Sequence, residues 1–140
     1  MLPIDYTLCV IASWLVLAVL GLALQGSPRL ITRLIFPVGA LASLALAATA
    51  LAALGQTPNV AVLPLGLPDL PFHLRLDALS AFFLLILGAA SFGISLYSAG
   101  YFRSMAGSTL GLLTFEYHLF LASMALVLLA DDAYLFMVAW

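Results

Sequence analysis

Residues 119–140 read LFLASMALVLLADDAYLFMVAW, and this stretch decides the fold class. An uncharged, mostly apolar run from 119 to 130 leads into two aspartates, Asp131 and Asp132, and eight uncharged residues follow them. A helix needs about 20 apolar residues to cross roughly 30 Å of hydrocarbon. We therefore interpret the stretch as the end of one membrane helix, a short acidic turn and the truncated start of a further helix.

The composition of the whole chain is that of a membrane protein. Of its 140 residues, 66% are hydrophobic and 7% are charged, and its mean hydropathy is +1.25. A soluble domain is roughly 45–50% apolar and about 25% charged. A net charge of −2 with only four arginines excludes a nucleic-acid-binding surface. One cysteine and two histidines offer no iron–sulfur or other metal ligand set, so we expect neither a metal nor a cofactor.

The apolar stretches predict an all-α polytopic membrane protein, multi-pass in the cell (inner) membrane, with the lipid bilayer as a partner. Three stretches of spanning length lack any ionisable charge, and a fourth contains two acidic or basic residues near its start. The predicted elements are helices over about residues 6–24, 34–55, 78–102 and 112–130, a hairpin loop over 56–76 and a partial helix over 132–140. We expect these elements to form a single unit.

The segment between the second and third spans predicts a small β-hairpin. Its four prolines exclude a continuous helix. Apolar and polar side chains alternate over residues 72–76, which is typical of a strand, and residues 61–63 could pair with it across a turn at 66–69. An open sheet cannot satisfy its backbone groups in hydrocarbon. We therefore expect the hairpin to lie in the aqueous or interfacial layer.

The four arginines predict the orientation. Arg29 and Arg33 follow the first span and Arg103 follows the third, whereas the loop after the second span has only Arg75. Cytoplasmic loops carry an excess of positive charge. We therefore place the first and third loops on the cytoplasmic side, and the N-terminus, the hairpin and the aspartate turn on the extracytoplasmic side.

The second span carries small residues, Gly39, Ser43 and Ala47, at every fourth position, and the third span has a similar face. Small residues let helix backbones approach closely in lipid, so this face is expected to pack against protein. The alternative is that an alanine-rich helix produces such a stripe by chance.

Glu116 and His118 are the only acidic or basic residues inside a predicted span, and both fall in its first two turns. A carboxylate at a helix centre costs about 2.5–3.5 kcal/mol on insertion scales, and less near an end. Positions i and i+2 point to different faces of a helix, so the two are not a local pair. Either residue could feed protons from the cytoplasmic side into a buried path. The alternative is that both snorkel or bond to neighbouring helices near the interface.

Asp131 and Asp132 could attract cations at the outer mouth of a proton path. The alternative is that they end one helix and cap the next, with Asp132 as N-cap, because aspartate accepts hydrogen bonds from free backbone N–H groups. Asp77, directly before the third span, also fits a helix cap. Proton transport needs a titratable group near mid-membrane, and we expect none in the four spans. No residue pattern predicts a catalytic site.

The second half of the chain resembles a known family. Residues 74–83, LRLDALSAFF, followed by Ser95, Tyr97 and Tyr101, resemble the third-helix region of antiporter-like proton-conducting membrane subunits. Such subunits occur in respiratory complex I, in multisubunit Na⁺/H⁺ antiporters, and in hydrogenase-4 and formate hydrogenlyase. Residues 118–131 and 135–140 look like the fourth helix of that family and the start of its fifth. The sequence of these motifs is most similar to that of hydrogenase-4 component B.

The resemblance implies the N-terminal fragment of a proton-translocating subunit that couples electron transfer to proton movement in a respiratory redox complex, of the hydrogenase-4 or NADH-quinone oxidoreductase type. It implies other membrane and peripheral subunits as partners. The redox centres of such complexes lie in other subunits, so this one would be non-catalytic. In the family a glutamate directly follows the position of Trp140 and pairs with a later lysine. The alternative is a small membrane scaffold or accessory subunit that transports nothing.

Overall fold

The computed structural model describes residues 2–67, 70–104 and 109–140. Across these residues, four helices are long and apolar enough to cross a membrane. They are α1 (Pro3–Ala23), the continuous segment Pro28–Ala53, α4 (Ala78–Tyr101) and α5 (Thr109–Leu129). The second consists of α2 (Pro28–Leu30), a π-helical turn η1 (Ile31–Ile35) and α3 (Phe36–Ala53). The prediction of four such helices is confirmed.

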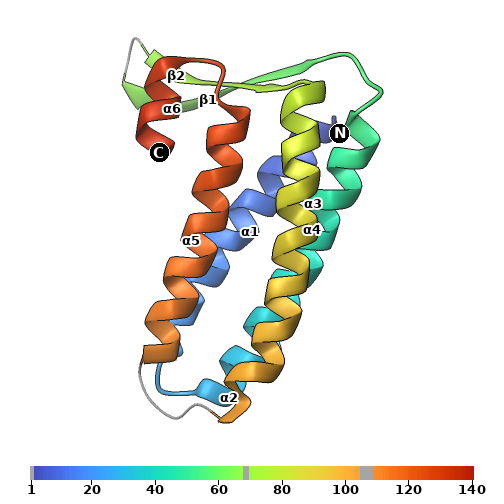
Figure 1. The fold of residues 1–140 in the computed structure, drawn as a ribbon. Coiled ribbons are helices and arrows are strands. Elements are labelled where there is room, and N and C mark those ends of the chain that lie inside the picture. The colour runs from blue at the N-terminus through green and yellow to red at the C-terminus, as the bar shows by residue number, and fades with distance from the viewer. Residues whose placement is uncertain (1, 68–69, 105–108) are drawn as a thin grey trace.

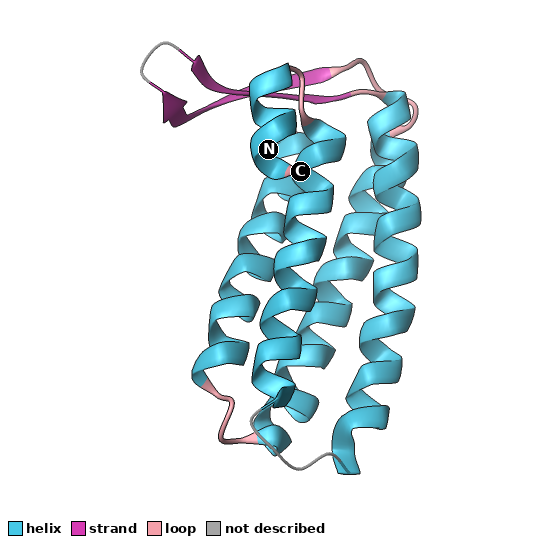
Figure 2. Ribbon diagram, turned by 60° about the vertical axis from the view of Figure 1, so that its left-hand side comes forward, coloured by secondary structure: helices cyan, strands magenta, loops and turns pink. Residues whose placement is uncertain are grey.

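The shorter elements lie at the two ends of the bundle. A hairpin of β1 (Asn59–Leu67) and β2 (Leu70–Leu76) crosses one end, beside the short helix α6 (Ala133–Ala139) (Figure 1). The 3₁₀ turn η2 (Phe102–Ser104) contacts α2 at the other end. Figure 2 shows the hairpin projecting sideways beyond the helices.

Close backbone contacts hold the helices in two pairs. α3 packs mainly against α4, and a Cβ added at Gly88 of α4 would lie 2.7 Å from the backbone nitrogen of Ala47 and 2.8 Å from the carbonyl oxygen of Ser43. Because such contacts are too short for any side chain, only glycine allows this approach. The prediction that the Gly39–Ser43–Ala47 face packs against protein is confirmed.

α1 packs mainly against α5, and glycine again sets the distance. A Cβ on Gly111 would lie 2.7 Å from Gln25 Cα and 2.8 Å from the carbonyl oxygen of Gly21. α5 begins at Thr109 in the described part of the chain, three residues before the predicted start. Glycine often marks a loop in a sequence, whereas Gly111 is a packing residue in the first turn of the helix.

The second spanning segment begins at Pro28, six residues before the predicted start. Ser27 is the N-cap residue and Pro28 occupies the first turn, where its missing N–H costs little. Farther along, Pro37 has no N–H for a regular helical bond, and its ring would crowd the carbonyl four residues earlier. The π turn widens the helix just before it, with the Phe36 N–H donating to the carbonyl of Ile31.

The hairpin is confirmed, with strands longer than predicted. β1 and β2 are antiparallel, Ala61 pairs with Leu74, and the register shifts between Leu63 and Gly66. Gly66 has φ +107°, a conformation that glycine adopts without strain. Of the predicted turn, residues 68 and 69 lie outside the described part of the chain. Leu74 and Leu76 are buried, as the alternation over residues 72–76 requires.

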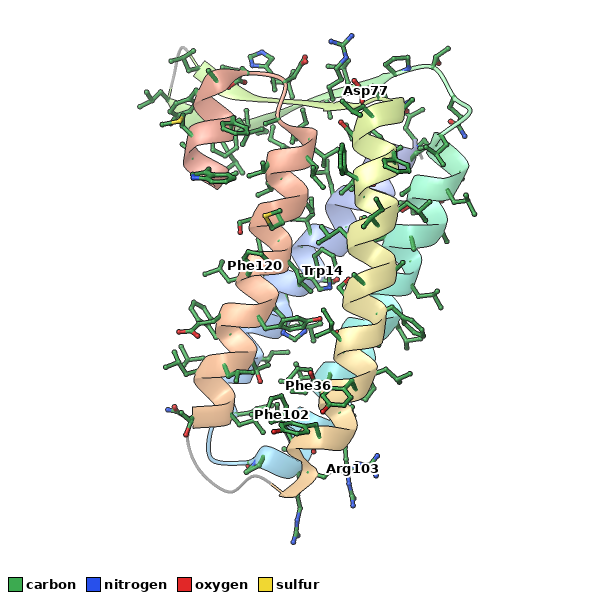
Figure 3. The ribbon with its side chains drawn as sticks, viewed as in Figure 1. Trp14, Phe36, Asp77, Phe102, Arg103 and Phe120 are labelled. Atoms are coloured by element: carbon green, nitrogen blue, oxygen red, sulfur yellow. The ribbon has the colours of Figure 1, made fainter. Side chains whose placement is uncertain are left out.

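The arginines divide between the two ends of the bundle. Arg29 and Arg33 lie on α2 and η1, and Arg103 on η2 lies at the same end (Figure 3). Arg75 lies on β2, two residues before Asp77, which Figure 3 shows at the opposite end. The described arginines of the first and third loops therefore share one end of the bundle, as the predicted orientation requires. Which face is cytoplasmic remains a prediction.

Candidate functional site

His118 lies in the middle of α5 and is fully buried. It is the tenth of 21 residues in the helix, and its side chain has 0% exposure. With a rise of 1.5 Å per residue, it lies about 14 Å from the start of the helix, which is close to half of the roughly 30 Å hydrocarbon thickness. The expectation that no span holds a titratable group near its middle was therefore wrong, because it rested on a helix that began too late.

The surroundings of His118 define its tautomer. Nδ1 lies 2.9 Å from the carbonyl oxygen of Thr114. A carbonyl oxygen only accepts, so Nδ1 carries the proton and donates it. The lone pair of the neutral ring is then on Nε2, which is buried and has no hydrogen-bond partner among the residues that the structure describes. His118 thus presents a free proton acceptor inside the bundle.

Two residues of the second spanning segment shape the space around His118. A Cβ on Gly39 of α3 would lie 2.6 Å from Nε2, so glycine at this position leaves room for the imidazole. The ring of Phe36 lies 6.1 Å from the imidazole, centroid to centroid. The imidazole of α5 therefore packs against α3, a helix that is far from it in the sequence.

Tyr117, the residue before His118, links α5 to α4 through hydrogen bonds. Tyr117 Oη donates to the carbonyl oxygen of Ser91 over 3.1 Å and lies 2.9 Å from Ser95 Oγ. Since the tyrosine hydroxyl has one proton, Ser95 donates to it. On α1, the fully buried Trp14 has an Nε1–H with no partner in the described ranges, and Figure 3 places it near mid-height in the bundle. The interior at this level therefore contains polar groups from α1, α4 and α5.

The chemistry that the arrangement around His118 could support is proton exchange. Nε2 of a neutral imidazole can accept a proton while Nδ1–H remains bonded to Thr114, and the ring can release a proton from either nitrogen. Histidine is the side chain best suited to such exchange near neutral pH. Within the described residues, no group of three or more His, Cys, Asp or Glu side chains could hold a metal ion.

Glu116 lies on the other side of α5. Its side chain is exposed, whereas that of His118 is buried, so the structure does not bring the two together. Glu116 is the eighth residue of α5 and faces away from the polar cluster. It lines a shallow outer hollow with Leu110 and Leu113.

Asp131 and Asp132 lie at the hairpin end, far along α5 from His118. Asp132 is the N-cap of α6, and its Oδ1 accepts from the Leu135 N–H over 2.7 Å. Its Oδ2 accepts from the His73 N–H and lies 3.2 Å from His73 Nδ1. Donation from the Leu135 N–H is the main reason why the pKa of Asp132 is lowered, and His73 lowers it further.

Asp131 fastens the same turn to the hairpin. Its Oδ1 lies 3.4 Å from Arg75 Nη1, and its backbone N–H donates to the carbonyl oxygen of His73 over 3.0 Å. Ala130 forms an isolated β-bridge with Leu74. The two aspartates therefore join α5 and α6 to the hairpin, and the structure does not place them beside the buried cluster.

Asp77 is the N-cap of α4. Its Oδ1 accepts from the Ser80 N–H over 2.8 Å, and this bond is the main reason why its pKa is lowered. Asp77 therefore has a structural position at the hairpin end of the bundle, and Figure 3 shows it at the end opposite Arg103.

Sequence reasoning missed the partners of these residues. The bonds of Tyr117 to Ser91 and Ser95 join positions 26 and 22 residues apart, and the contacts of the aspartate turn with His73 and Arg75 span 59 and 56 residues. The small-residue face of the third span was the only sequence signal for the bonds of Tyr117. No local pattern indicated the contacts of the aspartate turn with His73 and Arg75.

A scan of protein-family models and a search of curated proteins found no match to this chain.

Proposed function

We propose that this chain is part of a proton-translocating membrane subunit, and that His118 is a proton-relay group in its interior. The observation that carries the proposal is the buried Nε2 of His118, which is a free acceptor at the middle of a spanning helix. Ionisable residues inside spanning helices mark proton relays and ion pathways, because lipid makes them expensive elsewhere.

The resemblance of residues 74–83 and 118–140 to antiporter-like subunits supports the same function. On that basis the chain is the N-terminal part of a subunit of a respiratory redox complex, of the hydrogenase-4 or NADH-quinone oxidoreductase type. Its partners are other membrane and peripheral subunits, its location is the cell (inner) membrane, and the chemistry of electron transfer occurs in those other subunits. The Arg29, Arg33 and Arg103 end faces the cytoplasm.

A second candidate is a small membrane scaffold or accessory subunit that transports nothing. The observation that favours it is the glycine-mediated packing at Gly88 and Gly111, which brings helix backbones into direct contact. Such packing explains a stable four-helix unit without a role for any titratable side chain.

Proton flux in liposomes separates the two candidates. The 140-residue protein is reconstituted into vesicles that contain a pH-sensitive dye, and a potassium diffusion potential drives proton entry. The relay predicts flux above that of empty vesicles, and this flux is lost in His118→Leu because leucine cannot accept a proton. His73→Gln, which removes the other histidine, keeps the flux.

Vesicles that conduct no better than empty ones would favour the scaffold, as would equal flux in the wild type and His118→Leu. Thermal unfolding of His118→Leu in detergent provides the control for folding. In addition, a coding sequence that continues past Trp140 with a glutamate codon and further spans would support the antiporter-like assignment.

A further inference from the structure

The outward face of α5 has a carboxylate at its centre. Glu116 is exposed and is surrounded along the helix by exposed apolar side chains, which are Leu112, Leu113, Leu119 and Phe120. The spacing of these residues, i, i+1, i+4, i+7 and i+8, puts them on one continuous helix face. This helix face is apolar at every one of these positions except Glu116, so it suits an apolar environment elsewhere.

Glu116 lies too deep to reach water along its own helix. It follows Thr109, the start of α5, by seven residues, which places it about 10 Å into the helix. α5 has 21 residues, which is just enough to cross the hydrocarbon. Long lysine and arginine side chains can snorkel to the interface, but glutamate is shorter. A lipid-facing carboxylate at this depth is therefore unfavourable.

Among the described residues, Glu116 has no ion-pair partner, because the ion pairs that they form are Arg75 with Asp131 and His73 with Asp132. The sequence has no lysine, and its four arginines at positions 29, 33, 75 and 103 all lie in the described ranges. Arg75 pairs with Asp131 at the hairpin end, and Arg103 donates to the carbonyl oxygen of Ala99. Arg29 on α2 and Arg33 on η1 form no ion pair with Glu116 in the described ranges.

We propose that the outer face of α5 docks a transmembrane helix of a partner protein that carries a lysine or arginine at the depth of Glu116. The cation neutralises the carboxylate, and the leucines and Phe120 pack against apolar side chains above and below it. Charged residues within membranes pair with one another in this way. The proposal does not depend on proton relay by His118, which lies on the opposite side of the helix.

Energy transfer in phosphatidylcholine vesicles tests the docking. Cys9, the single cysteine, is exposed on α1 and takes the donor dye. The acceptor is attached to a leucine–alanine peptide helix of about 21 residues with one lysine about 10 Å from an end, or with leucine at that position. We expect the lysine peptide to associate about ten-fold more tightly than the leucine peptide.

Three variants make the test specific. Glu116→Gln should remove the preference for the lysine peptide, and Glu116→Lys should instead prefer a peptide with aspartate at the matching position. Ile94→Gln, on an exposed face of α4, should leave the preference unchanged. Equal association of both peptides with the wild type, or a lysine preference that survives in Glu116→Gln, would overturn the proposal. Glu116-dependent energy transfer between two copies of the protein would also overturn it, because the occupant would then be a second copy.

Discussion

The two faces of α5 handle an ionisable side chain in opposite ways. His118 points inward, donates to Thr114 and fits against Gly39, so that its charge state is governed by the interior of the bundle. Glu116, two residues earlier, points outward from a face of exposed leucines. Both lie well inside the same spanning helix. Position along a helix therefore sets the depth of a residue, but the side of the helix decides whether its partner is within the chain or outside it.

The largest expected effect concerns the inward side of α5, where His118 packs against Gly39. Gly39→Ala would put a Cβ 2.6 Å from His118 Nε2, and the imidazole is held by its bond to Thr114, so either the ring or α3 must move. We expect the free energy of unfolding in detergent to fall by about 2 kcal/mol. Gly93→Ala is the matched control, because a Cβ there meets nothing within 4 Å. Equal stability of the two variants would show that the position of the His118 imidazole does not require glycine at residue 39.

The next largest effect concerns the outward side of α5, which carries Glu116. Glu116→Leu removes a carboxylate from the membrane depth of α5 and should favour insertion of that helix by about 1–2 kcal/mol in a translocon assay. His118→Leu, two residues away, should also favour insertion in this assay, because the inserting helix lacks the neighbours that bury the imidazole in the folded bundle. If Glu116→Leu left insertion unchanged, the carboxylate would not lie at the depth that the helix length implies.

The smallest effect concerns the hairpin end, whose acid response must be separated from that of the bundle interior. The pKa of Asp132 is lowered in the folded protein, chiefly by the Leu135 N–H. Its stabilising contribution is therefore present above about pH 4, the ordinary aspartate value, and is lost as the pH falls through the lower folded-state pKa. The protection factor of the Leu135 amide, which compares its exchange rate with that of an unstructured amide at the same pH, should fall over that acid range.

Asp132→Asn provides the control for this titration. Asparagine still caps a helix but does not titrate, so the protection factor of the Leu135 amide should no longer fall over that range. Asp77→Asn, at the start of α4, should leave the Leu135 amide unaffected. An unchanged pH dependence in Asp132→Asn would assign the acid response to another group.

Much of the fold follows from local properties of the chain. Spanning length and the absence of charge predict the helices, proline and alternation predict the hairpin, and aspartate before an apolar run predicts the caps at Asp77 and Asp132. Helix starts were less predictable, because Pro28 and Gly111 are loop signals in sequence and helical in the structure. Glycine opposite a neighbouring backbone costs nothing, but a sequence does not show that neighbour.

The site was less predictable for the same reason. An error of three residues at the start of α5 moved His118 from mid-helix to an apparent interface position. The glycine that accommodates it, Gly39, is on another helix, and so are the serines that bond Tyr117. The pairing of Asp132 with His73 depends on the docking of the hairpin onto α6. Each of these contacts follows from packing between distant segments, which no local spacing encodes.

The protonation of His118 tests the account most directly. The measurement is nitrogen-15 NMR of the imidazole in the full chain in bilayers, with His73→Gln leaving His118 as the only histidine. For the neutral ring we predict a protonated Nδ1 and an unprotonated Nε2, because Nδ1 donates to the carbonyl oxygen of Thr114. A neutral ring with the proton on Nε2 would contradict the account, because the free acceptor inside the bundle would then not exist.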